Sequence, residues 1–403
     1  MLTLVRFDSE TRVFRQVRQI PDLTFRGPRG RSDGYLERLL FGLLAKLMIF
    51  GRFESAYVRF IPRALVRFGR KIWQRYLGEW NLEEDEDWRS GPVAAMTESD
   101  TLLLMDVPQD LGHLAGLRKI SEVSGGPTLA VYLHDLIPVR QAREFDPINW
   151  LSRVGSFQEY LRVVSRADVV VANSEFSARE FTAWMSERDM TLPPTLGVLY
   201  PAWPRPANSG KTSDDTQPEV GGVLASTADL RILALGAIDT RKNFRVLIPA
   251  IRKATEDWGL DCCLCVVAGS GKLIDKHFLR ALKDLPRPLR RRVTFLPGVS
   301  DADVERLYDW ADVVVVPSRA EGFGLPVVEA LSRNVPVIVS RGTALTELAD
   351  LFELQACDPF DSGEWSSALA NVRFDSRPSE AIPEVIPSDY KDFYRRLEQF
   401  LTD

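Results

Sequence analysis

The sequence predicts an α/β protein with two domains, each built on a parallel β-sheet. In the C-terminal half, short apolar segments of strand type alternate with segments of helical type, which is typical of parallel sheets with right-handed crossovers. The valine run 313–316 has the β-branched composition of a strand that is buried on both faces. The length of 403 residues fits two or three domains. Ligands of such folds bind at the carboxyl ends of the strands.

The individual elements are expected at apolar runs that are bounded by turn residues. In the C-terminal half, strands are expected at 231–236, 262–268, 293–298, 313–316 and 335–340, and helices at 244–253 and 301–310. In the N-terminal half, strands are expected at 3–7, 101–105, 128–133 and 167–172, with Ser174 as a helix cap after the last of them. A final helix is expected at 389–401.

The domain boundary is placed at a polar stretch of the chain. Residues 208–227 are rich in Ser, Thr, Gly and Asp, which is typical of a linker. We therefore expect an N-terminal domain over 1–207, a linker over 208–228 and a C-terminal domain over 229–388. A C-terminal helix over 389–403 is expected to cross back to the first domain.

Composition and charge limit the partners and cofactors. The net charge of −5 and the pI of about 5.6 argue against nucleic acid, which usually needs a dominant basic surface. Cys262 and Cys265 have CxxC spacing, but three of the four cysteines are crowded into one apolar run, so neither a zinc site nor a disulfide framework is indicated. The three histidines are too scattered for a metal cluster. The first residues lack the basic start and apolar core of a signal peptide. We expect a cytoplasmic protein without a bound metal.

Residues 38–76 mix basic side chains with aromatic and aliphatic ones. The apolar run at the start of this segment is too short and too charged to span a bilayer, which needs about 20 apolar residues. Two interpretations remain open. The segment forms helices that lie in a membrane interface, which would make the protein peripheral on the inner face of the membrane. Alternatively, its apolar side chains belong to the core and its arginines form a solvated face.

The predicted strand ends in the C-terminal half carry residue types that bind phosphate. Gly236 ends one strand and is followed by the cationic turn 239–243, and the next strand ends at Gly269. Val299 follows the third strand, and the fourth runs into a glycine-rich turn. Glycine lets the backbone approach a ligand closely, and the amides at a helix start attract anions. These strand ends therefore predict a site for a phosphate-bearing ligand.

The glycine-rich turn also brings two carboxylates to this site. Residues 321–326 read Glu-Gly-Phe-Gly-Leu-Pro, and a second glutamate, Glu329, follows eight positions after Glu321. The first glutamate then lies on the loop, and the second lies about one turn inside the following helix. Both side chains can face the same crevice.

This pair of glutamates around a glycine turn resembles the signature of the retaining, nucleotide-sugar-dependent glycosyltransferases of family 4, a family of group 1 glycosyltransferases. The turn 236–243 is similar to the family's pyrophosphate turn, with Lys242 at the position of the family's lysine. Many members have an arginine where this chain has Ala237, and Arg241 then supplies the second positive charge. The resemblance implies the GT-B fold, in which two Rossmann-like domains with parallel sheets face a cleft.

The resemblance also implies roles for individual residues. Glu321 contacts the donor sugar, Glu329 holds the ribose hydroxyls, and Lys242 with Arg241 neutralises the leaving diphosphate. In the first domain, His134 lines the cleft near the donor sugar. The positions expected to bind the nucleotide part of the donor are Gly236, Gly269, Val299, Gly322, Phe323, Gly324, Leu325 and Glu329.

One element departs from the family. Its first strand normally ends in a glycine-rich loop that approaches the donor phosphates, whereas the strand expected at 3–7 is followed by residues without glycine. The nearest glycines are Gly27, Gly30 and Gly34. Either that segment replaces the loop, or the donor is bound mainly by the other domain.

The expected activity is retaining transfer of a sugar from a nucleotide diphosphate sugar to a glycan or lipid-linked acceptor, in cell-surface polysaccharide biosynthesis. Fixed cations and backbone amides stabilise the charge that develops on the diphosphate, so no metal is required. The main alternative is a non-catalytic nucleotide-sugar-binding or scaffold protein on the same fold. An epimerase or phosphorylase is less consistent with the sequence, because neither a pyridoxal-phosphate lysine nor a free-phosphate pocket is apparent.

Overall fold

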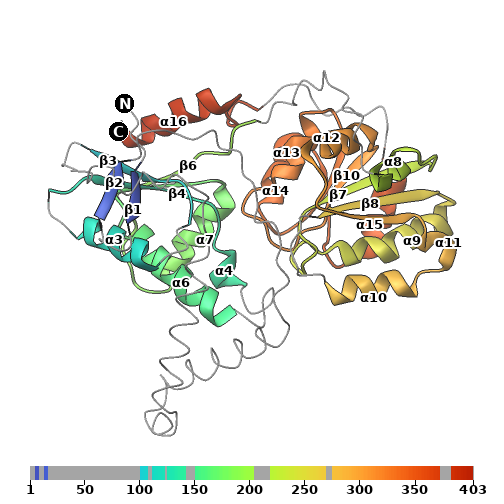
Figure 1. The fold of residues 1–403 in the computed structure, drawn as a ribbon, viewed down its shortest axis with the longest axis horizontal. Helices are drawn as coiled ribbons and strands as arrows, with labels where there is room; N and C mark the ends of the chain where they lie inside the picture. The colour runs from blue at the N-terminus through green and yellow to red at the C-terminus, as the bar shows by residue number, and fades with distance from the viewer. Residues whose placement is uncertain are drawn as a thin grey trace, which may run out of the picture. The chain divides into compact units, whose positions relative to one another are not determined.

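The structure of the protein is a computed structural model. The residues that it describes are 5–8, 13–16, 100–107, 111–122, 125–141, 150–203, 218–268, 275–372 and 383–402. The segment 38–76, Gly27, Gly30, Gly34 and Gly269 lie outside them. The chain divides into two compact units, and the larger one holds both parallel sheets (Figure 1). The smaller unit comprises residues 1–100, 107–127 and 146–163, and the larger unit comprises 101–106, 128–145 and 164–403.

In its described residues, the smaller unit contains one antiparallel strand pair and two helices. Strand β1 (Val5–Asp8) pairs antiparallel with β2 (Val13–Gln16), with Val5 opposite Gln16. The strand expected at 3–7 is therefore present, but it pairs antiparallel and not in a parallel sheet. The helices are α3 (Leu111–Ser121) and α6 (Trp150–Val164), whose last residue belongs to the larger unit.

The first parallel sheet of the larger unit has the strand order β3-β4-β5-β6. Its strands confirm the three expected between 101 and 172, because their apolar side chains are buried together. Ser174 caps the helix that follows β5, and its side-chain oxygen accepts a hydrogen bond from the Ser177 amide at 3.0 Å. The elements are β3 (Thr101–Leu104), β4 (Thr128–Leu133), α4 (Ile137–Arg140), β5 (Val169–Ala172), α7 (Glu175–Ser186) and β6 (Thr195–Val198).

The second parallel sheet has the strand order β12-β11-β10-β7-β8-β9. Its strands β7 and β10 are central neighbours, with Ile232 opposite Val313. All five strands that the sequence predicts here are found within one or two residues of the expected ends. They are β7 (Leu230–Leu235), β8 (Cys262–Ala268), β9 (Val293–Pro297), β10 (Val313–Val316) and β11 (Val337–Ser340), and β12 (Gln355–Cys357) follows them.

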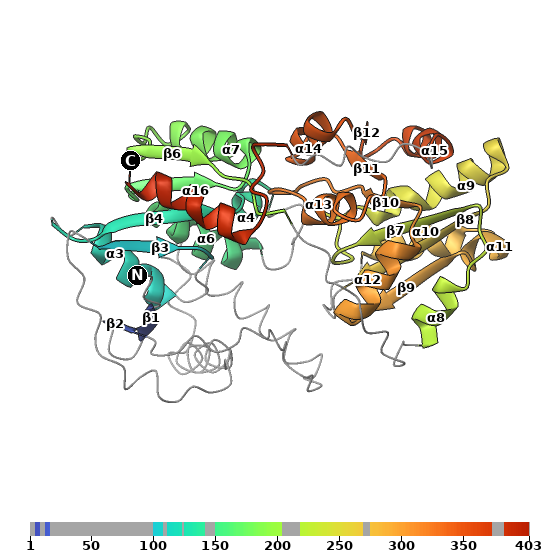
Figure 2. The ribbon, with the colours of Figure 1, turned by 90° about the horizontal axis from the view of Figure 1, so that it is seen from above.

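Helices cover both faces of the six-stranded sheet. The side chains of β10 alternate between the two faces, since Val314 and Val316 join one core and Val313 and Val315 the other. The first core is closed by α8 (Pro218–Leu224), α12 (Asp301–Trp310), α13 (Leu325–Leu331) and α14 (Leu345–Phe352). The second is closed by η3 (Phe244–Val246), α9 (Leu247–Trp258), α10 (Lys276–Asp284) and α15 (Ser362–Ala370), with α11 (Arg287–Arg290) beside it (Figure 2).

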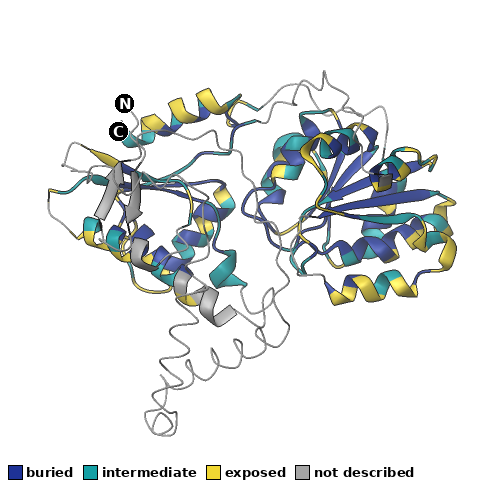
Figure 3. Ribbon diagram, in the orientation of Figure 1, coloured by how far each residue is buried: buried dark blue, intermediate teal, exposed yellow. Residues whose placement is uncertain are grey.

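Two segments near the expected domain boundaries fold in specific ways. Pro218–Leu224, inside the range 208–228 expected as a linker, forms helix α8 with Val220 and Val223 buried in the core, so this part is not a linker. The final helix, α16 (Tyr390–Thr402), packs Phe393 and Leu397 against the four-stranded sheet. Figure 3 shows the buried strands beneath the exposed outer sides of the helices.

Within the described ranges, no helix combines the length and the apolar character needed to cross a bilayer.

Candidate functional site

The candidate site lies at the carboxyl ends of β7 and β10, where the sequence places its cationic turn and its glycine turn. Gly236 directly follows β7 and has φ +135°. A Cβ atom at this position would lie 2.9 Å from Cε of Lys242. Glycine therefore leaves the space through which the Lys242 side chain passes over the strand end. Gly236 and Lys242 are both site residues in the sequence analysis, and the structure places them next to each other.

Lys242, Arg241 and Glu321 form one buried cluster. Lys242 Nζ lies 2.5 Å from Oε1 of Glu321, and Arg241 Nη1 lies 3.3 Å from its Oε2. The Ser318 hydroxyl donates a further hydrogen bond to Oε1 at 2.7 Å. Both Lys242 and Glu321 are 8% exposed. A carboxylate with two cations and a hydroxyl is thus held in a largely water-free position, at the end of two neighbouring strands.

The cluster fixes the charge of Glu321. Burial disfavours the ionised carboxylate, but the Lys242 ammonium and the Arg241 guanidinium outweigh it and hold the pKa of Glu321 below its ordinary value. The carboxylate is therefore ionised at neutral pH, and it balances only one of the two cations. The Asp239 carboxylate faces the other cation, with its Oδ2 3.8 Å from Nε of Arg241, so two cations and two carboxylates lie together here. A phosphate ligand would compete with these carboxylates for the two cations.

The cationic turn is fastened to the strands around it. Asn243 has a left-handed backbone, with φ 55°, and its side-chain amide donates to the carbonyl oxygens of Pro317 and Pro359 at 3.0 and 2.7 Å. Asp239 Oδ1 accepts from the Lys242 amide at 2.9 Å. The Arg319 amide donates to the Arg241 carbonyl at 2.7 Å. These bonds position the two cations before any ligand arrives.

The glycine turn brings the backbone into close contact with its surroundings. Gly324 has φ +114° and precedes helix α13, and a Cβ there would collide with Leu345. A Cβ at Gly322 would collide with the His134 carbonyl, and the Gly322 carbonyl accepts from the Ser174 hydroxyl at 2.6 Å. Within the larger unit, this turn therefore tolerates no side chain at either glycine. Phe323 is buried between them, whereas Leu325 is half exposed.

Glu329 belongs to a second hydrogen-bond network. Its Oε2 accepts from the Tyr308 hydroxyl at 2.7 Å. The Arg333 guanidinium lies over the Tyr308 ring, 4.6 Å from its centroid, and donates to the Glu329 carbonyl at 2.7 Å. Burial, together with the Glu329 carboxylate, raises the pKa of Tyr308 far above its ordinary value. Tyr308 is therefore a permanent donor that fixes the Glu329 carboxylate.

Two other predicted site residues, Val299 and His134, make no contact with the Lys242 cluster among the described hydrogen bonds and ion pairs. Val299 follows β9, after Gly298 with φ +65°, and is half-buried against the core. The His134 ring lies with Nε2 2.8 Å from the Met105 carbonyl oxygen and edge-on to the Tyr132 ring. Among the described residues, no hydrogen bond or ion pair joins this ring to the Lys242 cluster.

The sequence assigned no individual role to three polar residues of this region. Ser318 carries a signal, because it stands three residues before Glu321 at the end of a buried strand. Asp135 adjoins His134, and burial raises its pKa although the Arg241 guanidinium opposes the shift, so the carboxyl lies within electrostatic reach of the cluster. Tyr308 carries no local signal, since only the packing of α12 beside α13 brings it to Glu329.

The described residues contain neither a group of metal ligands nor a reactive thiol. Within the described ranges, no three His, Cys, Asp or Glu side chains come together as a metal site. The four cysteines are free and buried, and burial raises the pKa of Cys262 and Cys265 to about 12. They are protonated at neutral pH and behave as small apolar side chains.

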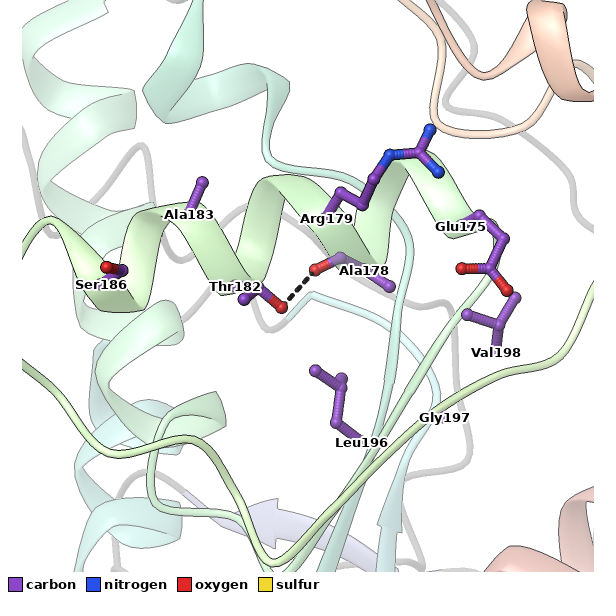
Figure 4. Close-up of a pocket in the computed structure, with 9 residues that line it drawn as sticks. All are labelled: Glu175, Ala178, Arg179, Thr182, Ala183, Ser186, Leu196, Gly197 and Val198. Atoms are coloured by element: carbon purple, nitrogen blue, oxygen red, sulfur yellow. Dashed lines mark hydrogen bonds between the residues drawn. The ribbon is translucent and has the colours of Figure 1, made fainter.

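A surface pocket of about 740 Å³ lies elsewhere, between α7 and β6 (Figure 4). Glu175, Arg179 and Thr182 line it from the helix, and the Thr182 hydroxyl donates to the Ala178 carbonyl. It contains none of the site residues that the sequence predicts, so the Lys242 cluster and not this pocket is the candidate site.

Comparisons with known proteins bear on this geometry. Residues 222–370 match the profile of the family described as "Glycosyl transferases group 1". The serotype-specific mannosyltransferase WbdA of Escherichia coli is 23% identical over 331 residues, which cover 78% of this chain and 38% of the relative. The O-antigen chain mannosyltransferase RfbU of Salmonella typhimurium is 32% identical over 166 residues, which cover 41% of this chain and 42% of the relative. The chain thus spans less than half the length of either relative.

The fold is that of known glycosyltransferase structures. The crystal structure of a UDP-forming α,α-trehalose-phosphate synthase from Burkholderia xenovorans matches with a TM-score of 0.52 and 14% identity, over 76% of this chain and 71% of the other. The predicted GT-B fold class, with two parallel α/β sheets, is confirmed. The family profile covers both glutamates and the cationic turn. Residues 222–370, which hold the candidate site, are therefore similar to the group 1 glycosyltransferases.

Proposed function

We propose that the protein is a retaining glycosyltransferase that moves a sugar from a nucleotide diphosphate sugar to a glycan or lipid-linked acceptor, in the synthesis of a cell-surface polysaccharide. The buried cluster of Lys242, Arg241 and Glu321 carries this proposal, because it offers preorganised positive charge beside a carboxylate. The relatives WbdA and RfbU are mannosyltransferases by name, which supports a hexose such as mannose as the transferred sugar.

The chemistry assigned to the cluster follows from where charge develops. As the bond between sugar and diphosphate breaks, negative charge grows on the leaving phosphate. Lys242 and Arg241 stabilise it more in the transition state than in the ground state, which is the condition for catalysis. Glu321 contacts the sugar, and the leaving phosphate helps to deprotonate the acceptor hydroxyl on the same face. No residue is assigned as a covalent nucleophile.

The remaining predicted residues bind the nucleotide in this proposal. Glu329 accepts hydrogen bonds from the ribose hydroxyls through the carboxylate oxygen that Tyr308 does not occupy. The amides of residues 323–325 meet the diphosphate, Val299 lies beside the base, and His134 lies near the sugar. The segment 38–76 remains a candidate for peripheral membrane contact.

The protein is expected to consume a nucleotide diphosphate hexose in the presence of EDTA, because fixed cations take the place of a divalent ion. Purified protein is first screened for thermal stabilisation by UDP, GDP, ADP and their sugars, since a ligand of the native state raises the melting temperature. Release of the nucleoside diphosphate is then measured with and without EDTA. An absolute requirement for Mn²⁺ or Mg²⁺ would contradict the assigned role of Lys242 and Arg241.

Tyr308→Phe is expected to weaken nucleoside diphosphate binding by about threefold to tenfold, because a hydrogen bond that fixes a carboxylate contributes roughly 1 kcal/mol. The value of kcat should change little, since Glu329 contacts only the nucleotide part. Thr255→Val is the control, because it removes a half-buried hydroxyl that donates to the Leu260 carbonyl at 3.0 Å, outside the site. Equal effects of the two variants on binding would remove Tyr308 from the site.

One observation favours a second candidate function. Strand β1 pairs antiparallel with β2, and no glycine loop follows it that could approach donor phosphates. A protein without that loop would bind nucleotide sugars as a scaffold and turn none over. Thermal stabilisation by a nucleotide sugar, without release of its nucleoside diphosphate in the presence of any acceptor tested, is the result that favours the scaffold.

A further inference from the structure

A strongly basic surface lies on α10 and α11, outside the candidate site. Residues 276–292 carry seven basic side chains and one acidic one, a net charge of +6, although the whole chain has a net charge of −5. Figure 3 shows exposed residues along the outer sides of both helices. The exposed basic residues of this face, called the basic face below, are Lys276, Arg280, Lys283, Arg287, Arg290 and Arg291.

The charges of the basic face are not neutralised within the described part of the chain. None of the six side chains forms an ion pair with a described carboxylate. Arg292, which is half-buried in the same segment, does pair with Asp261, and Arg252 on the neighbouring helix α9 pairs with Glu256 at 2.8 Å. The basic face therefore presents its charge to an external partner.

This arrangement works against the stability of α10. Lys276, Arg280 and Lys283 follow one another at spacings of four and three residues, so they lie on one side of the helix and repel each other. Lys276 is also the first residue of the helix, where the helix dipole favours an acidic side chain. Lys283 in the last turn is favourable for the helix dipole, but Lys276 at the first position and the repulsion along this side are not, so helix stability alone does not account for the pattern.

The helix presents the basic face rigidly, together with an apolar side chain. Phe278 is 1% exposed and anchors α10 to the core, and Asp275 caps the helix by accepting from the His277 amide at 2.8 Å. Leu279 is 40% exposed and lies on the same side as Lys276 and Lys283. The apolar face of α10 itself packs against the core, so Leu279 is the apolar side chain that the basic face presents to an external partner.

We propose that the basic face docks the protein on the surface of an anionic lipid bilayer. Lipid headgroups are mobile and can pair with cations at any spacing, so no specific pocket is needed, and the attraction acts within a Debye length of the surface. Leu279 enters the boundary between headgroups and acyl chains. A soluble anionic polysaccharide would satisfy the cations but would leave Leu279 without an apolar environment. The proposal does not depend on sugar transfer, although docking would hold the enzyme where a lipid-linked acceptor resides.

The test compares two double variants of the full-length protein that change the net charge equally. Lys276→Glu with Lys283→Glu alters the basic face, and Lys119→Glu with Lys391→Glu alters two exposed lysines elsewhere. Co-sedimentation is measured with vesicles of phosphatidylcholine alone and with vesicles that also contain phosphatidylglycerol. The wild type should bind only the anionic vesicles, and less at high salt. The basic-face variant should lose at least about tenfold in partitioning, as expected for several cations near an anionic surface, whereas the control should stay within about threefold of the wild type.

Three further measurements accompany this comparison. Lys276→Glu places an acidic residue at the N-terminus of α10 and Lys283→Glu places one in its last turn. Because these changes act on the helix dipole in opposite directions, the melting temperature of the basic-face variant should stay close to that of the wild type. Donor consumption should be unchanged, because neither lysine belongs to the candidate site. Leu279→Ala should weaken vesicle binding at every salt concentration. Equal vesicle binding by the basic-face and control variants would overturn the proposal, as would binding to soluble dextran sulfate with no binding to anionic vesicles.

Discussion

Lys242→Ala is expected to weaken nucleoside diphosphate binding by about tenfold to a hundredfold, because a charge-assisted hydrogen bond to a buried group contributes roughly 1.5 to 3 kcal/mol. Turnover should fall further, since the ammonium stabilises charge that is largest in the transition state. The variant also removes the 2.5 Å contact with Glu321, although Arg241 and Ser318 remain as partners of that carboxylate. Calorimetry and the donor-consumption assay measure the two effects.

Arg231→Ala is the matched control for this variant. Arg231 lies at the opposite end of the same strand, β7, and forms an ion pair with Asp312 at 2.6 Å. Its loss should lower the free energy of unfolding, as the loss of Lys242 does, without changing nucleotide binding. If Lys242→Ala binds nucleoside diphosphate and turns over donor as well as Arg231→Ala does, Lys242 is not part of the donor site.

Much of the fold could be predicted because the decisive signals are local. The strands Thr128–Leu133, Cys262–Ala268 and Val313–Val316 are continuous apolar runs, and the helix Asp301–Trp310 starts after a serine cap, so their limits agree with the sequence-based ones. Helix Pro218–Leu224 was not predicted, because its two buried valines stand among glycines in a polar stretch. A pattern of two apolar residues is too short to distinguish a helix from a linker.

The antiparallel pairing of β1 with β2 could not be predicted for a different reason. The alternating strands and helices of this chain favour parallel neighbours, and nothing in the residues Val5–Asp8 specifies an antiparallel partner. Strand pairing is a tertiary choice, so the sequence of a single strand leaves it open.

The sequence could predict which residues of the candidate site follow the ends of parallel strands, but not the contacts that depend on how the helices pack. Lys242 and Glu321 are 79 positions apart, yet both follow strands of one parallel sheet, and the carboxyl ends of such strands meet at one edge. The hydrogen bond between the Lys242 ammonium and the Glu321 carboxylate agrees with this expectation. The hydroxyl of Tyr308 was missed because its partner is set by how two helices pack, and the His134 ring is engaged with the Met105 carbonyl, which no sequence pattern specifies.

The two glutamates are expected to respond differently to replacement, because they belong to separate networks. Glu329→Ala should weaken both the free nucleoside diphosphate and the intact donor by about tenfold to a hundredfold, as expected for a hydrogen bond to a charged group. Glu321→Ala should leave the free nucleotide bound as tightly as before or more tightly, because Lys242 and Arg241 then lose the carboxylate that competes with phosphate. It should instead lower kcat, since contact with the sugar strengthens as the bond to the diphosphate breaks.

The central claim is that Glu321 faces the transferred sugar and Glu329 the nucleotide of a bound donor. Calorimetric titration of both alanine variants with the nucleoside diphosphate that most stabilises the wild type tests this claim most directly. The account predicts a weakened dissociation constant for Glu329→Ala and an unchanged or tighter one for Glu321→Ala. Equal weakening in both variants, or wild-type affinity in both, would contradict the assignment of the two glutamates.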